Sequence, residues 1–297
     1  MNANLPFDKA IQRPANPAMR RALRLFSWSS ALRQAVLIAA CFLVLLPAYF
    51  MLATALKTPE AYSLSKFSFP TSPTLDNFNA ALRGGRFVVW FLNSAILAIS
   101  AVAVSLAVSA LAAFAIARMR FRGATLFLGL NTALMVIPPV VMLIPLFLLL
   151  TNTRLIGSYA GAALVYAGLL TPFSVYLLVN FFRAIPHEVI ESALIDGAAP
   201  FMILLRIVLP LSVPALVTLV VVNGLWVWND LLIALILLPR DDLRTLMVGI
   251  TVFGSRYNND VPVAMAGMLL ASLPMLLVYI FGQRYFIRGL IAGAVKG

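Results

Sequence analysis

Six long apolar stretches constrain the fold of this chain more than any other feature of its sequence. They cover residues 34–56, 87–117, 123–153, 155–182, 211–238 and 261–283, and the only Asp, Glu, Lys or Arg inside them is Asp230. A helix of about 20 apolar residues crosses the hydrocarbon of a bilayer. Hydrophobic residues make up 62% of the chain and charged residues 11%, whereas a soluble domain is about half apolar and a quarter charged. The sequence therefore predicts an all-α integral membrane protein with six transmembrane helices.

The charged and metal-binding residues argue against several other classes of protein. The net charge is +12, but the arginines stand between apolar stretches, where such residues orient helices in a membrane. We therefore expect no nucleic-acid partner. Cys41 is the only cysteine and His187 the only histidine, so no metal site is expected.

The basic residues also predict the orientation of the chain. Residues 1–32 form a polar, basic arm ahead of a first span that we expect to be retained. If this arm is cytoplasmic, more Lys and Arg lie in the inner connections than in the outer ones. We therefore expect both termini in the cytoplasm, with the arm at 1–32 and one membrane domain at 33–297.

A polar interruption at 183–214 has the pattern of two short amphipathic helices. Pro186 suits the first turn of a helix, and Glu188 and Glu191 suit its positive end. Gly197, after Asp196, can take the left-handed conformation that ends a helix. Apolar residues recur at helical spacing on both sides of this turn, at Val189, Ile190, Ala193 and Leu194, then at Phe201, Leu204, Leu205 and Val208. Such a pair either lies on the lipid surface or docks into the groove of a partner.

The same segment resembles the cytoplasmic loop of ABC importer permeases, which has the pattern Glu-Ala-Ala, three residues, glycine and an apolar stretch ending in Leu-Pro. Glu191-Ser192-Ala193 stands for the triplet, Gly197 for the glycine and Leu209-Pro210 for the end. Ser192 departs from the usual alanine, which is a small change. Further segments are similar to carbohydrate-uptake permeases of the maltose and glycerol-phosphate type, namely 73–78, 93–94, 112–123, 226–235 and 282–297.

The resemblance implies which segments meet other proteins. The loop at 183–210 would dock on an ATPase subunit through Glu188, Glu191, Ser192, Ala193, Asp196, Gly197 and Pro210. The cytoplasmic tail at 284–297 would reach the ATPase interface as well. The outer loop at 253–260 would enter a binding protein through Gly254, Ser255, Arg256, Tyr257 and Asn258.

It also implies the composition of the assembly. The partners would be a second homologous permease subunit, two cytoplasmic ATPase subunits, an extracytoplasmic solute-binding protein and membrane lipid. The chain would lie in a bacterial inner membrane and import a sugar or sugar-like solute of the oligosaccharide, polyol or glycerol-phosphate type. It would be no enzyme and hold no cofactor, with ATP and Mg bound to the ATPase subunits.

The lysines support that division of labour independently. The chain has four, Lys9, Lys57, Lys66 and Lys296, and none follows a glycine. A phosphate-binding loop of the Gly-Lys-Ser/Thr kind therefore cannot form, and ATP hydrolysis must occur on another chain.

A few polar residues inside the spans are candidates for the solute path, namely Asn93, Asn131, Asn223 and Asp230. Amides can bind sugar hydroxyls, but hydrogen bonds between helices are their commoner use. Asp230 could line the path, relay a proton or play a structural part, and we favour the structural part. The alternative function is a self-contained secondary carrier driven by an ion gradient, for which Asp230 is the one intramembrane charge. A membrane-embedded enzyme would need clustered His, Asp, Glu or Cys, which the sequence lacks.

Overall fold

The computed structural model describes residues 28–294 apart from 84, 120 and 257–259, with side chains for 32–251 and 260–283. The part described is built of helices and turns, which confirms the all-α class. The five longest helices are α2 (Trp28–Ala55), α5 (Arg86–Arg118), α8 (Tyr159–Ala184), α12 (Val213–Asn229) and α15 (Val261–Ala294). The predicted tail at 284–297 is a continuation of α15 as far as Ala294, and its last three residues lie outside the described part.

Shorter helices connect these five. They are α3 (Pro59–Leu64), α4 (Asp76–Leu82), α6 (Ala124–Leu134), η1 (Pro139–Met142), α7 (Leu143–Asn152), α9 (His187–Ile195), α10 (Pro200–Ile203), η2 (Leu204–Val208), α11 (Leu209–Leu211), α13 (Leu232–Leu237) and α14 (Leu246–Arg256). In the described residues, four helices are long and apolar enough to cross a membrane, and two bent helix pairs raise that number to as many as six.

Two of the predicted spans are broken. The stretch at 123–153 bends by 93° between α6 and the η1–α7 pair. Pro138 is extended there and Pro139 opens η1, and a proline removes a backbone donor and clashes with the preceding turn. The stretch at 211–238 is also not one helix, because α12 ends at Asn229 and Asp230 is extended before α13 begins. The prolines indicate the first break in the sequence, whereas continuous apolar composition hid the second.

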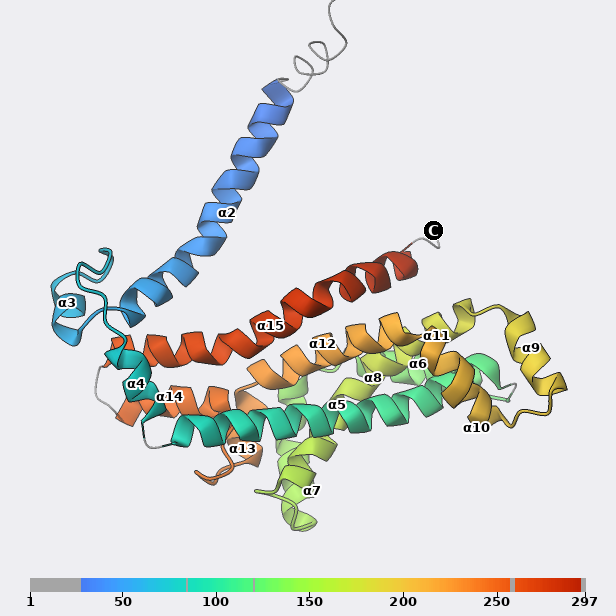
Figure 1. The fold of residues 1–297 in the computed structure, drawn as a ribbon. Helices are drawn as coiled ribbons and strands as arrows, with labels where there is room; N and C mark the ends of the chain where they lie inside the picture. The colour runs from blue at the N-terminus through green and yellow to red at the C-terminus, as the bar shows by residue number, and fades with distance from the viewer. Residues whose placement is uncertain (1–27, 84, 120, 257–259, 295–297) are drawn as a thin grey trace, which may run out of the picture.

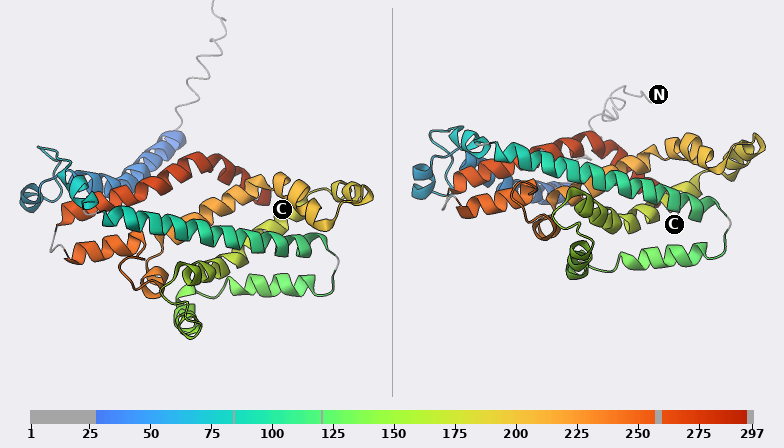
Figure 2. Two further views of the ribbon diagram at one scale, coloured as in Figure 1. Left: turned by 60° about the horizontal axis from the view of Figure 1, so that its bottom comes forward. Right: turned by 90° about the horizontal axis from the view of Figure 1, so that it is seen from below.

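The helices lie along one another in an elongated body (Figures 1 and 2). α5 and α8 form its core through small side chains, and Ala101, Ala113 and Ala162 are fully buried between them. Small residues allow helix backbones to approach closely in lipid. α2 instead leaves the body at a steep angle (Figure 1), and no residue of its best apolar window is buried. One end of the body carries α3 and α4, and the opposite end carries α9 and α10.

Candidate functional site

Residues 186–211 form a compact unit at the end of the molecule that carries α9, and we call this unit the knob. Arg118, at the end of α5, holds the residues just before the knob. Its guanidinium donates hydrogen bonds to the backbone carbonyls of Phe182 and Ile185, where α8 ends. A cation suits this place because the last carbonyls of a helix have no partner inside the helix. The knob therefore starts from a fixed point.

The first arm of the knob is α9, which attaches through two small contacts. Ile190 and Ala193 are buried against the body, and Val189 is half-buried. Leu194, however, is 50% exposed and its neighbour Ile195 is 86% exposed. The body therefore covers only part of the predicted apolar face and leaves Leu194 open.

The polar residues of α9 point to solvent. Glu188, Glu191, Ser192 and Asp196 are all exposed. Glu191 lies 3.0 Å from Nδ1 of His187 one turn earlier, and Ser192 donates back to the carbonyl of Val189. Pro186 is the residue just before α9 and not part of its first turn. The exposed side chains of this arm can meet another molecule.

The turn after α9 has the predicted left-handed glycine. Gly197 has φ of +78°, and its N–H donates to the carbonyl of Leu194. The N–H of Ala198 donates to the carbonyl of Ala193, which is the double closure typical of a helix C-terminus. A Cβ on Gly197 would meet nothing within 4 Å. The backbone conformation alone therefore favours glycine here.

The second arm of the knob is irregular. α10, a π-helical turn (η2) and α11 follow one another without a straight axis, and the whole arm bends by 77° into α12. Of the four apolar residues predicted to share one side, Leu204 and Val208 are buried, whereas Phe201 and Leu205 are exposed. Pro210 lies exposed in the first turn of α11.

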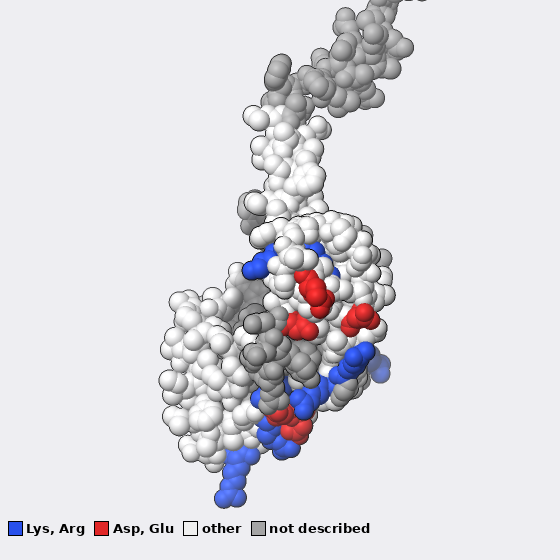
Figure 3. Space-filling view, turned by 90° about the vertical axis from the view of Figure 1, so that its left-hand side faces the viewer, with Lys and Arg blue, Asp and Glu red and all other residues white. Residues whose placement is uncertain are grey.

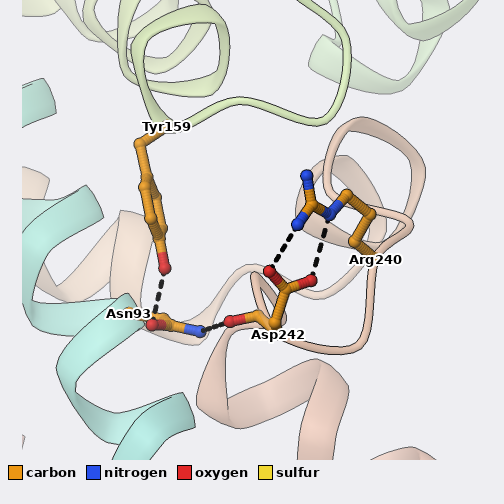
Figure 4. A network of polar contacts seen from close by, with 4 residues as sticks. All are labelled: Asn93, Tyr159, Arg240 and Asp242. Atoms are coloured by element: carbon orange, nitrogen blue, oxygen red, sulfur yellow. Dashed lines mark hydrogen bonds and ion pairs between the residues drawn. The ribbon is translucent and has the colours of Figure 1, made fainter.

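Charged side chains of both signs gather at the opposite end (Figure 3). Asn93 of α5 donates to the backbone carbonyls of Asp242 and Arg244, both at 2.9 Å, and accepts from the hydroxyl of Tyr159 at 2.6 Å (Figure 4). Ser94 accepts from the N–H of Leu246. We call Asn93, Ser94 and the segment 242–246 the clamp. Asn93 is buried and fully bonded, so its expected place in a solute path has no structural support.

A salt bridge on the surface borders the clamp. Arg240 donates two hydrogen bonds to the carboxylate of Asp242, at 3.0 and 2.7 Å. These bonds hold the pKa of Asp242 below its usual value and raise the pKa of Arg240. Both side chains are exposed, so solvent screens the pair and its weight in stability is small.

A second set of hydrogen bonds holds the loop between α2 and α5. Lys57 is only 1% exposed, and its ammonium donates to the carbonyls of Ser65 and Lys66 at 2.8 and 3.2 Å. The amide of Asn77 donates to the carbonyls of Ala55 and Lys57. Neither role was predicted, since both residues stand among other polar residues of a loop.

Two other candidate amides join helices. Asn131 of α6 donates to the carbonyl of Pro172 in α8 at 2.9 Å. Asn223 of α12 is buried and donates to the hydroxyl of Ser174 in α8 at 2.9 Å. Asn223 also lines a cavity of about 720 Å³ between α12, α8 and the broken α6–α7 pair, whose walls are mostly apolar. Both amides have the commoner use considered for them, as links between helices.

Asp230 lies at the break between two helices and not inside a continuous span as predicted. One carboxylate oxygen, Oδ2, accepts from the hydroxyl of Tyr166 at 2.7 Å and from the N–H groups of Ile233 and Ala234 at 3.0 and 3.1 Å. It therefore closes the first turn of α13 as an N-cap does. The residue also lines a second cavity of about 670 Å³ with Trp226, Asn229 and Tyr279. Tyr166 was not a predicted site residue, because it stands in an apolar stretch with no polar pattern around it.

The segment expected to enter a binding protein is only partly described. α14 extends to Arg256, so the backbone of Gly254, Ser255 and Arg256 is helical and not an open loop. The helical pattern of this segment was not predicted, because its polar residues and Gly254 favour a loop. Tyr257 and Asn258 lie outside the described residues.

Comparison with known proteins relates these features to a family. Residues 105–291 match the family described as binding-protein-dependent transport system inner membrane component. A putative ABC transporter permease protein of Caldicellulosiruptor sp. is 41% identical over 84% of this chain and 91% of its own length. The arabinooligosaccharides transport system permease protein AraQ of Halalkalibacterium halodurans is 33% identical over 77% of this chain and 81% of its own length.

A solved structure has the same fold. It is a chain of a bacterial ABC transporter involved in the import of the acidic polysaccharide alginate. The two superpose with a TM-score of 0.77 over 88% of this chain and 99% of the other, at 23% sequence identity.

Proposed function

This chain belongs to the family of binding-protein-dependent transport system inner membrane components, and from that membership we propose that it is a permease subunit of an ATP-driven sugar importer. The solute would be a sugar or sugar-like compound that crosses the inner membrane by alternating access. The names of the relatives support this class of solute, because they include permeases for arabinooligosaccharides, α-glucosides and diacetylchitobiose. The carrier alternative loses support, since Asp230 already accepts three hydrogen bonds within the protein.

The proposed topology has six spans with both termini in the cytoplasm. The bent pair of α6 with η1–α7 would then form one span, and α12 would begin the fifth span after the second arm of the knob. The whole knob would face the cytoplasm, and the α3–α4 end and the clamp would face outside. The excess of Lys and Arg in the inner connections supports this orientation. The transmembrane domain would cover 33–297 and follow the basic arm at 1–32.

The proposed partners follow the expected division of labour. A second permease subunit would complete the path, two ATPase subunits would bind ATP and Mg, and a binding protein would deliver the solute. In this proposal the segment at 254–258 meets the binding protein, and the end of α15 together with the tail at 284–297 reaches toward the ATPase subunits. This chain itself would hold no cofactor and catalyse no reaction.

The observation that carries the proposal is the form of the knob. It offers exposed acidic and apolar groups next to one another, with Glu191 beside Leu194 and Ile195 on α9 and Phe201 across the turn. A helix that presents apolar anchors with a charged edge fits a groove on a partner protein. We assign the ATPase contact to Glu188, Glu191, Ser192, Ala193, Asp196, Gly197 and Pro210, as the loop pattern implies. Ala193 would act from beneath, because it is buried and holds α9 on the body.

The test compares changes in the knob with matched controls. Gly197→Val forces a β-branched residue to positive φ, which costs about 1–3 kcal/mol of strain and would tilt the two arms. Glu191→Lys reverses one exposed charge. We expect both variants to stay in the membrane, to lose co-purifying ATPase and to lose solute-stimulated hydrolysis in reconstituted vesicles. Gly197→Asn and Glu191→Gln are the controls and should keep most of both.

A knob that only lies on lipid predicts a different result. Gly197→Val and Glu191→Lys would then change ATPase binding and hydrolysis only slightly. Normal ATPase binding and normal hydrolysis in both Gly197→Val and Glu191→Lys would refute the coupling role.

A further inference from the structure

The break between α12 and α13 leaves half of a carboxylate unused. All three hydrogen bonds to Asp230 reach Oδ2, and no donor within the described residues bonds to Oδ1. The side chain is half-buried and lines the cavity of about 670 Å³. An ionised carboxylate is an acceptor at both oxygens. Its structural duty therefore leaves one oxygen available to a ligand that carries hydroxyl groups.

An aromatic residue lines the same cavity as Asp230. Trp226 lies one turn before Asp230, on α12, lines the same cavity and is 37% exposed. Its ring meets the ring of Tyr166 edge-on, with centroids 5.9 Å apart, an arrangement that aromatic pairs favour. Tyr166 is fully buried and also donates to Asp230. One buried side chain thus orients both the indole and the carboxylate.

Two more residues complete the wall of the cavity. Asn229 is exposed and its amide N–H₂ donates to the carbonyl of Leu225 at 2.8 Å, which leaves its amide oxygen as an acceptor. Tyr279 of α15 lines the cavity too and is 48% exposed. A sugar ring has a C–H face that packs on an aromatic ring and an edge of hydroxyls that donate to acceptors. A mostly apolar pocket with a few placed polar groups meets both needs.

The charge of the cavity narrows the class of sugar. Asp230 is the one charged residue among the described residues that line it, and no Lys or Arg is found among them. A second carboxylate brought into this space would meet a like charge without a counter-ion among the lining residues, which is unfavourable. We therefore propose that Trp226, Asn229, Asp230 and Tyr279 form a subsite in this chain for a neutral sugar ring, and that Asp230 excludes acidic sugars. This inference rests on the proposed function and specifies further that the solute is uncharged.

The test reads the occupancy of the cavity directly. Val140 lines it and is exposed, so Val140→Cys in a Cys41→Ser background gives a thiol inside the cavity. The complete importer in detergent is treated with a maleimide alone, with maltotriose, raffinose, arabinotriose or diacetylchitobiose, or with trigalacturonate. Leu126→Cys, exposed on α6 and outside both cavities, is the control for effects unrelated to the site.

We expect at least one neutral sugar to slow labelling of Val140→Cys by about tenfold or more and trigalacturonate to leave it unchanged. The labelling rate follows the fraction of cavities that remain empty, and a tenfold difference in Kd between two sugars corresponds to about 1.4 kcal/mol of binding free energy. Asp230→Asn keeps an oxygen for the bonds at α13 and removes the charge, so trigalacturonate should then protect nearly as well as the neutral sugar. Trp226→Leu should abolish protection by the neutral sugar. Tyr176→Leu, a matched change of an exposed aromatic residue on α8, should not.

Three outcomes would overturn the subsite. They are no protection by any neutral sugar, equal protection by trigalacturonate in the unchanged protein, or protection that follows the chain length of the detergent, which would assign the cavity to an alkyl chain. Failure of the proposed function is a separate result. In that case no sugar stimulates ATP hydrolysis through the binding protein, whereas failure of the subsite alone leaves that stimulation intact.

Discussion

The two ends of this molecule are fastened in opposite ways. At the clamp, the side chains of Asn93 and Ser94 make directional hydrogen bonds to the backbone of 242–246, and Lys57 and Asn77 do the same for the loop after α2. At the knob, α9 attaches through the apolar contacts of Ile190 and Ala193, and Arg118 fixes only the point where α8 ends. Directional bonds to backbone hold a loop in one geometry, whereas apolar contacts are non-directional.

The difference separates the tasks of the two ends. At the clamp, the side chains of Asn93 and Ser94 find their partners within this chain. The knob leaves apolar groups exposed and so gains from a partner that covers them. A defect at the clamp should therefore damage this chain itself, and a defect at the knob should damage its attachment to others.

The largest effect is expected from Gly249→Ala in α14, beside the clamp. A Cβ there would fall 2.2 Å from ring atoms of Trp90, which is itself buried. Overpacking of this kind costs about 3 kcal/mol. We expect a clearly lower thermal unfolding midpoint of the purified importer. Gly224→Ala in α12 is the control, because its Cβ would meet nothing within 4 Å; an equal loss in both variants would contradict the close packing at Trp90.

A smaller effect is expected from Asn93→Ala. The change leaves two backbone carbonyls and the hydroxyl of Tyr159 without their partner, at a cost of about 2 kcal/mol. The unfolding midpoint should fall while the ATPase stays bound. Asn180→Ala removes an exposed amide that bonds only within its own helix and should change little. If Asn93→Ala spared stability but weakened the response to sugar, the residue would belong to the solute path after all.

The smallest effect on stability is expected at the knob, from Gly197→Ala. Its Cβ has free space, so the cost is only that of a left-handed non-glycine residue, about 1 kcal/mol. The midpoint should barely move, while the amount of ATPase that co-purifies should fall measurably. Gly197→Asn tolerates the same backbone and should restore binding. A drop in midpoint as large as that of Gly249→Ala would erase the contrast between the two ends.

The features that depend on neighbours along the chain were predictable from the sequence. Gly197 was found because few residues other than glycine adopt positive φ after a helix, and the buried pair Ile190 and Ala193 followed from helical spacing. The prolines at 138 and 139 indicate an interruption of the stretch at 123–153, whereas the break at Asp230 was not predicted, since apolar composition continues through it. A proline signals a kink, but its 93° size depends on what α6 and α7 pack against.

Contacts between distant residues lay beyond the sequence. Asn93 bonds to residues about 150 positions away, and a single sequence holds no sign of that pairing. Tyr166 was missed for the same reason, because its role is defined by Trp226 and by Asp230, which follows 64 positions later in the chain. Asp230 was among the predicted candidates, but its structural and ligand-binding roles were treated as alternatives, whereas the two oxygens of one carboxylate can serve both.

The isolation of α2 has a consequence for the order of synthesis. The apolar surface of this helix is bare along most of its length, and the helix meets the body mainly through α15, the last helix to be made. While the ribosome is still adding the residues between them, α2 therefore has little of its own chain to rest against. The fold closes only when its final segment arrives. A chain truncated before α15 would therefore keep a first helix that has lost most of its contacts with the rest of the chain.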